Sequence, residues 1–225
     1  MAEVIIALDL PGPEARHLLD RLPEARWVKV GPILFNREGP DLIRELTSRG
    51  LRVFLDCKWH DIPNTVAGAV EMAIEAGAAM ATVHALGGAA MLREASKAGA
   101  GRIALVGVTV LTSHDSGSYA RATGRPAVDL IDEARRLARE ATDAGLQGVV
   151  CSPLETVAIR DAIGPTPFIV VPGIRRAGDP SGDQARTSTP AEAVRRGATH
   201  LVVGRPILQA PDPAASFREI SETAR

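Results

Sequence analysis

The chain has 225 residues, of which 45% are hydrophobic and 24% charged, a composition typical of a globular protein. Its formal net charge of -1 gives no sign of a basic nucleic-acid-binding surface or of an acidic tail. The first nine residues hold only a short apolar run, with an acid at Glu3, so we expect a first strand and not a signal peptide. No apolar stretch approaches the length of a membrane span. Cys57 and Cys151 stand far apart, which predicts two reduced thiols in a cytoplasmic protein.

Short β-rich runs alternate along the chain with segments of helical spacing, such as residues 128–141. The expected strands are 4–9, 27–31, 53–58, 80–84, 103–110, 148–151, 168–171 and 201–204. Glycines that follow helical segments predict helix C-termini at Gly50, Gly77, Gly145 and Gly197. Eight βα units in this length give about 28 residues per unit, a compact value for a (β/α)8 barrel.

The expected fold class is therefore α/β, a (β/α)8 TIM barrel formed by a single domain over residues 1–225. The expected strands are continuous apolar runs, as in a parallel sheet covered on both faces. An open doubly wound sheet is the competing arrangement, and it is disfavoured because no Gly-x-Gly-x-x-Gly motif follows the first strand. No linker or break in composition divides the chain.

Polar residues gather at the expected C-terminal ends of the strands, where barrel enzymes carry their chemistry. A charged residue in an apolar strand is costly unless it is paired or functional. Charges at consecutive strand ends could pair across neighbouring strands, so they predict a site. In chain order these polar residues are Asp9, Lys29, Asp56, Lys58, His84, Thr112 and Ser113.

The most informative segment is Asp-Cys-Lys-Trp-His-Asp-Ile-Pro-Asn-Thr-Val, residues 56–66. Because strand side chains alternate, Asp56 and Lys58 are expected on one face and Cys57 on the other. Asp61 follows in the turn, and Pro63 is well placed to open a helix. A lysine held between two aspartates should keep its proton, which suits proton donation to a carbanion better than nucleophilic attack. The alternative interpretation is a surface ion-pair network at a strand–helix junction.

The ends of the last two expected strands indicate a phosphate site. Pro172-Gly-Ile-Arg175 and Val203-Gly-Arg-Pro206 stand where (β/α)8 barrels commonly bind phosphate. Gly173 and Gly204 permit the backbone to approach a phosphate closely, and the guanidinium group of Arg205 can donate two hydrogen bonds to it in a bidentate pair. The polar segment 176–188 is either a disordered loop or a lid, and its position favours a lid.

The histidines do not predict a metal centre. No His-x-x-x-His or comparable ligand pair occurs among the five. His17 and His114 are expected at the surface, and His84 as a hydrogen-bonding residue.

The segment Asp56–Thr65, combined with Val171-Pro-Gly-Ile-Arg175 and Val203-Gly-Arg205, resembles the orotidine 5'-phosphate decarboxylase family. The resemblance runs in order from Ala7-Leu-Asp9 to Gly204-Arg-Pro206, nearly the whole chain. It departs from the family pattern at Cys57, where an aliphatic residue is more frequent.

The resemblance implies a role for each matching residue. The charged tetrad would be Lys29, Asp56, Lys58 and Asp61, with Lys58 as the proton donor. Asp9 and Lys29 would hold ribose hydroxyls, and Thr112 and Ser113 would meet the pyrimidine. Arg175, Gln184, Gly204 and Arg205 would bind the phosphate, and Pro172 would be a further substrate-binding residue. Asp61, Ile62 and Thr65 would enter the site of the partner subunit, which implies a homodimer.

The implied reaction is loss of CO2 from orotidine 5'-phosphate to give uridine 5'-phosphate, with no metal or organic cofactor. Two alternatives stay open. The magnesium-dependent 3-keto-L-gulonate 6-phosphate decarboxylases and hexulose phosphate synthases share the barrel and an Asp-x-Lys-x-x-Asp pattern, although Ile62-Pro-Asn-Thr65 favours the orotidine enzyme. The chain could also be a non-catalytic binder of phosphoribosyl ligands, against which Lys58 argues.

Overall fold

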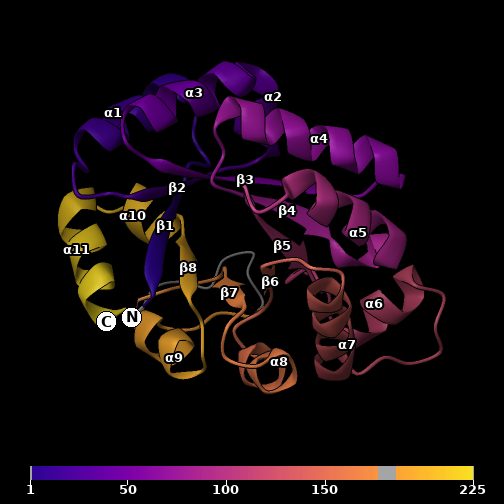
Figure 1. The fold of residues 1–225 in the computed structure, drawn as a ribbon. Coiled ribbons are helices and arrows are strands. Elements are labelled where there is room, and N and C mark those ends of the chain that lie inside the picture. Colours follow the sequence, from indigo (N-terminus) through magenta and orange to yellow (C-terminus); the bar gives the residue numbers. More distant parts are fainter. Residues whose placement is uncertain (1, 177–185, 225) are drawn as a thin grey trace.

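A computed structural model of the chain describes residues 2–176 and 186–224, and in it eight parallel strands close into a barrel (Figure 1). Each strand is hydrogen-bonded to the next in chain order, and β8 is hydrogen-bonded to β1. The strands are β1 Glu3–Ala7, β2 Trp27–Val30, β3 Arg52–Trp59, β4 Met80–His84, β5 Ala104–Val108, β6 Gly148–Val150, β7 Phe168–Val171 and β8 His200–Val203. The predicted (β/α)8 barrel is confirmed, and the alternative prediction of an open doubly wound sheet is excluded.

Helices pack around the outside of the barrel (Figure 1). They are α1 Gly12–Asp20, α2 Pro32–Glu38, α3 Pro40–Ser48, α4 Pro63–Ala76, α5 Gly88–Gly99, α6 Ser116–Ala122, α7 Leu130–Asp143, α8 Thr156–Ile163, α9 Pro190–Arg195, α10 Arg205–Leu208 and α11 Pro213–Thr223, with a 3-10 turn at Ala85–Gly87. In the part of the chain that the structure describes, none of these helices has the length and apolar character needed to cross a bilayer. The two ends of the chain meet where the backbone N–H of Ala2 donates to the carbonyl of Ala224.

Local sequence signals account for several helix boundaries. Pro63 opens α4, as its fixed φ and missing N–H favour. The four glycines predicted to end helices all have positive φ, from 81° at Gly50 to 101° at Gly197, where a residue with Cβ would be strained. The strand boundaries differ most from expectation at β1 and β5, which end two residues early, at Ala7 and Val108, so Asp9 lies two residues beyond its strand.

The barrel has an apolar interior beneath its C-terminal rim. The cluster that fills it comprises Ile5, Ala7, Trp27, Phe54, Met80, Val106, Val170 and Val202. A second and larger cluster lies between the strands and the surrounding helices. Because alternate strand residues face the interior, the residues that follow this inner cluster on β2 and β3, Lys29 and Asp56, also point inward, one layer higher. The fold thus places charges on an apolar floor.

Candidate active site

A cavity of about 550 Å³ opens at the C-terminal ends of the strands. Its volume lies within the range usual for sites that bind small molecules. Apolar side chains of Phe54, Val150 and Val202 form part of its lining. Its polar lining comprises Asp9, Lys29, Asp56, Lys58, Thr112, Arg175, Arg205 and Gln209, and Pro172, Gly173 and Gly204 also line it. Most of the predicted site residues are therefore brought together here.

Lys29 links two carboxylates across three neighbouring strand ends. Its Nζ lies 3.1 Å from Asp9 Oδ1 and 3.6 Å from Asp56 Oδ2. The Lys29 side chain is 11% exposed and that of Asp56 12%, so this pairing offsets the cost of burying both charges. Gly31 leaves room for the ammonium group, because a Cβ there would come within 3.2 Å of Lys29 Nζ.

Lys58 pairs with Asp56 at the end of β3. Its Nζ lies 2.8 Å from Asp56 Oδ1, so the two side chains share a face, as expected. Simple alternation is not the reason, because the strand is irregular here and Lys58 has a φ of 51°. Cys57 packs against the outer apolar cluster, also as expected, and burial raises the pKa of its thiol to about 11.

The segment after β3 does not line this cavity. Asp61, Ile62 and Thr65 are all exposed, and none of these three is among the residues that line the cavity. The Asp61 carboxylate instead accepts a hydrogen bond from the backbone N–H of Ile62, at 2.6 Å. Within one chain, Lys58 therefore pairs with Asp56, whereas Asp61 caps its own turn and does not line the cavity.

Arginines and glycines from β7 and β8 form the opposite side of the cavity. Gly173 has a φ of 78°, a conformation that favours glycine, and it precedes Arg175, which is 8% exposed. Arg205 is the first residue of α10 and follows Gly204. The backbone of Arg175 donates to the carbonyl of Ser188, which ties both sides of the intervening segment to the barrel rim.

Of the residues expected to contact the pyrimidine or to form the lid, only some lie among the described residues that line the cavity. Thr112 lines the cavity, whereas Ser113 is exposed and is not among its lining residues. Gln184 and most of the predicted lid, 176–188, lie outside the described residues. At the C-terminal end of that segment, Arg186 forms a buried ion pair with Glu155 and donates to the carbonyl of Leu111, next to Thr112.

His84 lies near the site at the end of β4. His84 stacks on His60 with ring centroids 5.4 Å apart, and its Nδ1 accepts from the backbone N–H of Leu86. Burial, together with the nearby His60 and Lys58, lowers the pKa of His84 to about 4. Within residues 2–176 and 186–224, no three His, Cys, Asp or Glu side chains gather as a metal site requires.

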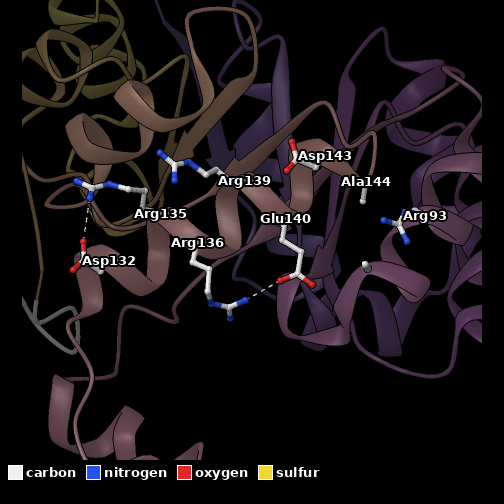
Figure 2. Close-up of a pocket in the computed structure, with 9 residues that line it drawn as sticks. Arg93, Asp132, Arg135, Arg136, Arg139, Glu140, Asp143 and Ala144 are labelled. Carbon is white, nitrogen blue, oxygen red and sulfur yellow. Dashed lines mark hydrogen bonds and ion pairs between the residues drawn. The ribbon is translucent and has the colours of Figure 1, made fainter.

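A second hollow, of about 520 Å³, lies on the outside of the barrel between α5 and α7 (Figure 2). Four of its charged side chains form ion pairs along α7, Arg135 with Asp132 and Arg136 with Glu140. None of the predicted site residues is among those that line it. We interpret it as a solvated surface of i,i+3 and i,i+4 ion pairs.

Thr82 and the Glu155–Arg186 pair are site-adjacent residues that sequence reasoning missed. Thr82 is fully buried, and its hydroxyl donates to Asp56 Oδ1 at 3.2 Å. A polar residue two positions before His84, within an apolar strand, is the signal that could have revealed it. No comparable signal marks Glu155 and Arg186, which are 31 residues apart.

The barrel, its rim of paired lysines and aspartates, and the arginines at β7 and β8 define a (β/α)8-barrel enzyme site for a phosphorylated small molecule. The family model described as "Orotidine 5'-phosphate decarboxylase / HUMPS family" matches residues 2–220. The chain belongs to this family.

Individual relatives agree with the family assignment. The orotidine 5'-phosphate decarboxylase of Anaeromyxobacter sp. (strain K) is 48% identical over 222 residues, covering 97% of this chain and 96% of the relative. That of Alkalilimnicola ehrlichii is 50% identical over 226 residues, with 97% and 94% covered. The crystal structure of orotidine 5'-phosphate decarboxylase from Lactobacillus acidophilus superposes with a TM-score of 0.89 at 35% identity, and all of both chains is covered.

Proposed function

We propose that this chain is a carboxy-lyase that converts orotidine 5'-phosphate to uridine 5'-phosphate and CO2, the last step in forming uridine 5'-phosphate by de novo pyrimidine biosynthesis. The observation that carries the proposal is the alternating array Asp9–Lys29–Asp56–Lys58 on the floor of a cavity whose far side presents Arg175 and Arg205. The relatives named for this activity match nearly the full length of the chain.

Asp56 and Lys58 carry the chemistry. When the bond to CO2 breaks, its electron pair stays on the ring carbon that held the carboxylate. The Lys58 ammonium stabilises this developing anion and then gives it a proton. The Asp56 carboxylate holds Lys58 in place and lies beside the substrate carboxylate, which it disfavours in the ground state.

The remaining residues bind and orient the nucleotide. Asp9 and Lys29 hold the ribose hydroxyls, and Thr112 contacts the pyrimidine, with Ser113 in the same loop. Arg175, Gly204 and Arg205 hold the phosphate, and Pro172 is a further substrate-binding residue. Segment 176–188 acts as a lid on which Gln184 reaches the phosphate, so binding energy remote from the reacting carbon is used to close the site.

The active form is a homodimer in which each site is completed by its partner. Ile33, Ile62 and Leu86 follow three consecutive strands, β2, β3 and β4, and are 74%, 67% and 38% exposed. Large apolar side chains exposed along one rim favour a protein partner, and a symmetric pair of chains uses the same patch twice. Such docking carries Asp61, Ile62 and Thr65 towards the other site, where Asp61 completes the tetrad.

The proposed site needs no metal or organic cofactor, because Lys29 and Lys58 supply the positive charge. The two cysteines are separate free thiols, as is typical of proteins in a reducing compartment, and this supports a cytoplasmic location. The deciding experiment follows the ultraviolet absorbance of orotidine 5'-phosphate during turnover, with and without excess EDTA.

Turnover that is undiminished by EDTA supports the proposal. Activity lost to EDTA and restored by magnesium would move the chain to the sugar-phosphate decarboxylases and synthases of the same family. Tight binding of uridine 5'-phosphate with no turnover would indicate a non-catalytic binder of phosphoribosyl ligands.

A further inference from the structure

The ladder between β3 and β4 is interrupted beside the charged array. Leu55 pairs with Ala81 and Trp59 pairs with Val83, so three residues of β3 lie opposite Thr82 alone. An irregularity of this kind leaves backbone groups of the bulged strand without their regular partners. Lys58 lies inside it with a φ of 51°, a conformation that a residue with a Cβ adopts only when its surroundings impose it.

The Thr82 hydroxyl occupies the gap. It accepts a hydrogen bond from the backbone N–H of Lys58 at 2.7 Å and donates one to Asp56 Oδ1 at 3.2 Å. A hydroxyl has one donor and two lone pairs, so it makes both bonds at once. Since Asp56 Oδ1 also accepts from Lys58 Nζ at 2.8 Å, the three residues form a closed ring of hydrogen bonds.

Thr82 acts through the residues that it touches. It is 0% exposed and is not among the residues that line the cavity. A substrate in the cavity would therefore contact Asp56 and Lys58 and not Thr82. Its partners also distinguish it from an ordinary buried threonine. Thr109, equally buried and directly after β5, donates to the carbonyl of Val150, a backbone group with no part in the charged array.

We propose that Thr82 is a positioning residue, which holds the Lys58 backbone in its left-handed conformation and fixes the Asp56 carboxylate that receives the Lys58 ammonium. This inference rests on the proposed function, because the geometry so held is that of the proton donor. Displacements of about 1 Å in such groups reduce rates by as much as about 10²-fold. Loss of the hydroxyl should therefore slow the chemical step while leaving substrate binding intact.

The test compares three variants. Thr82→Val removes the hydroxyl and keeps the branched shape, Thr82→Ser keeps the hydroxyl, and Thr109→Val removes a buried hydroxyl elsewhere. For orotidine 5'-phosphate, Thr82→Val should lower kcat by about 10–100-fold with KM within about threefold of wild type. Thr82→Ser and Thr109→Val should keep kcat within about threefold.

Three outcomes would overturn the inference: a kcat for Thr82→Val within threefold of wild type, an equal fall in Thr82→Ser, or a loss that lies wholly in KM. Circular dichroism and thermal melting establish that each variant folds. If the valine variant does not fold, Thr82→Ala is compared with Thr82→Ser in the same way.

A second measurement separates this inference from the proposed function. Amide hydrogen exchange at Lys58 should be faster in Thr82→Val than in wild type or Thr109→Val, because the N–H has lost its acceptor. A wild-type protein that does not decarboxylate the substrate would count against the proposed function, whereas unchanged exchange at Lys58 would count against the role of Thr82.

Discussion

The ammonium group of Lys58 lies 2.8 Å from Asp56 Oδ1, in a cavity that opens above the apolar interior of the barrel. The Asp56 side chain is 12% exposed, so its negative charge is stabilised mainly by the ammonium groups of Lys58 and Lys29. The Lys29 Nζ lies 3.6 Å from Asp56 Oδ2. Such an arrangement sets a fixed cation beside the place where a carbanion would form, and it needs little reorganisation during the reaction.

Replacing Lys58 with Ala should abolish decarboxylation and leave the fold intact. Loss of general acid catalysis alone lowers rates by about 10²–10⁴-fold, and lost electrostatic stabilisation adds to it. Turnover and circular dichroism are compared with Lys97→Ala, which removes an exposed lysine of α5 that pairs with Glu94. Retention of more than about a tenth of wild-type activity would contradict the assignment of Lys58 as proton donor.

Replacing Arg205 with Ala should weaken substrate binding through the phosphate and also slow the chemical step. The physical reason is that contacts remote from the reacting carbon are used to close and order the site. The measurement is kcat/KM for orotidine 5'-phosphate and for orotidine, which lacks the phosphate. The kcat/KM for orotidine should fall little in Arg205→Ala. The control Arg44→Ala, which removes an exposed arginine of α3, should change kcat/KM for neither substrate. An equal loss for both substrates would mean that Arg205 is not a phosphate ligand.

A buried histidine predicts that the protein loses stability in mild acid. His200 packs against Trp27 and Phe168 at the bottom of the barrel, with ring centroids 5.5 and 5.0 Å away. Burial, with a smaller effect of Arg52, lowers the pKa of His200 to about 4. Because the unfolded histidine titrates near pH 6.5, between pH 6.5 and 4 the proton binds the unfolded state preferentially, so stability falls as the pH falls through this window.

For His200 the expected loss is about 2 kcal/mol of unfolding free energy between pH 7.5 and 5. Urea unfolding at the two pH values measures it. His200→Gln should show a smaller loss than wild type by that amount, although His84, whose pKa is also about 4, keeps part of the dependence. His17→Gln, at an exposed site on α1, should behave like wild type. A wild-type slope in the His200 variant would refute this assignment.

The sequence predicted the barrel and the members of the cavity better than the contacts among them. Asp9, Lys29, Asp56 and Lys58 were recognisable because charges in apolar strands stand out, and parallel strands bring their ends to one rim. The bulge at Lys58 was not recognisable, since it depends on how β3 pairs with β4. Thr82 and the Glu155–Arg186 pair were missed for the same reason, because tertiary pairing and not local spacing creates their contacts.

Two inactive variants should together restore activity if Asp61 acts across a dimer interface. Lys58→Ala in one subunit and Asp61→Asn in the other leave a mixed dimer with one doubly defective site and one native site. The exposed Asp61, which does not line the cavity of its own chain, motivates the experiment. Random pairing makes about half of the dimers mixed, each with one native site, so activity should approach about a quarter of wild type.

The measurement is turnover after the two variants are refolded together in equal amounts, compared with each variant alone. Lys58→Ala mixed with Asp56→Asn is the matched control, because these residues pair within one chain and no mixed dimer then contains a native site. Activity in the first mixture but not in the control locates Asp61 in the partner's site. If mass measurement shows that mixed dimers have formed and turnover is still no greater than the sum of the separate variants, each site uses its own Asp61, and the exposed segment after β3 must close over its own barrel.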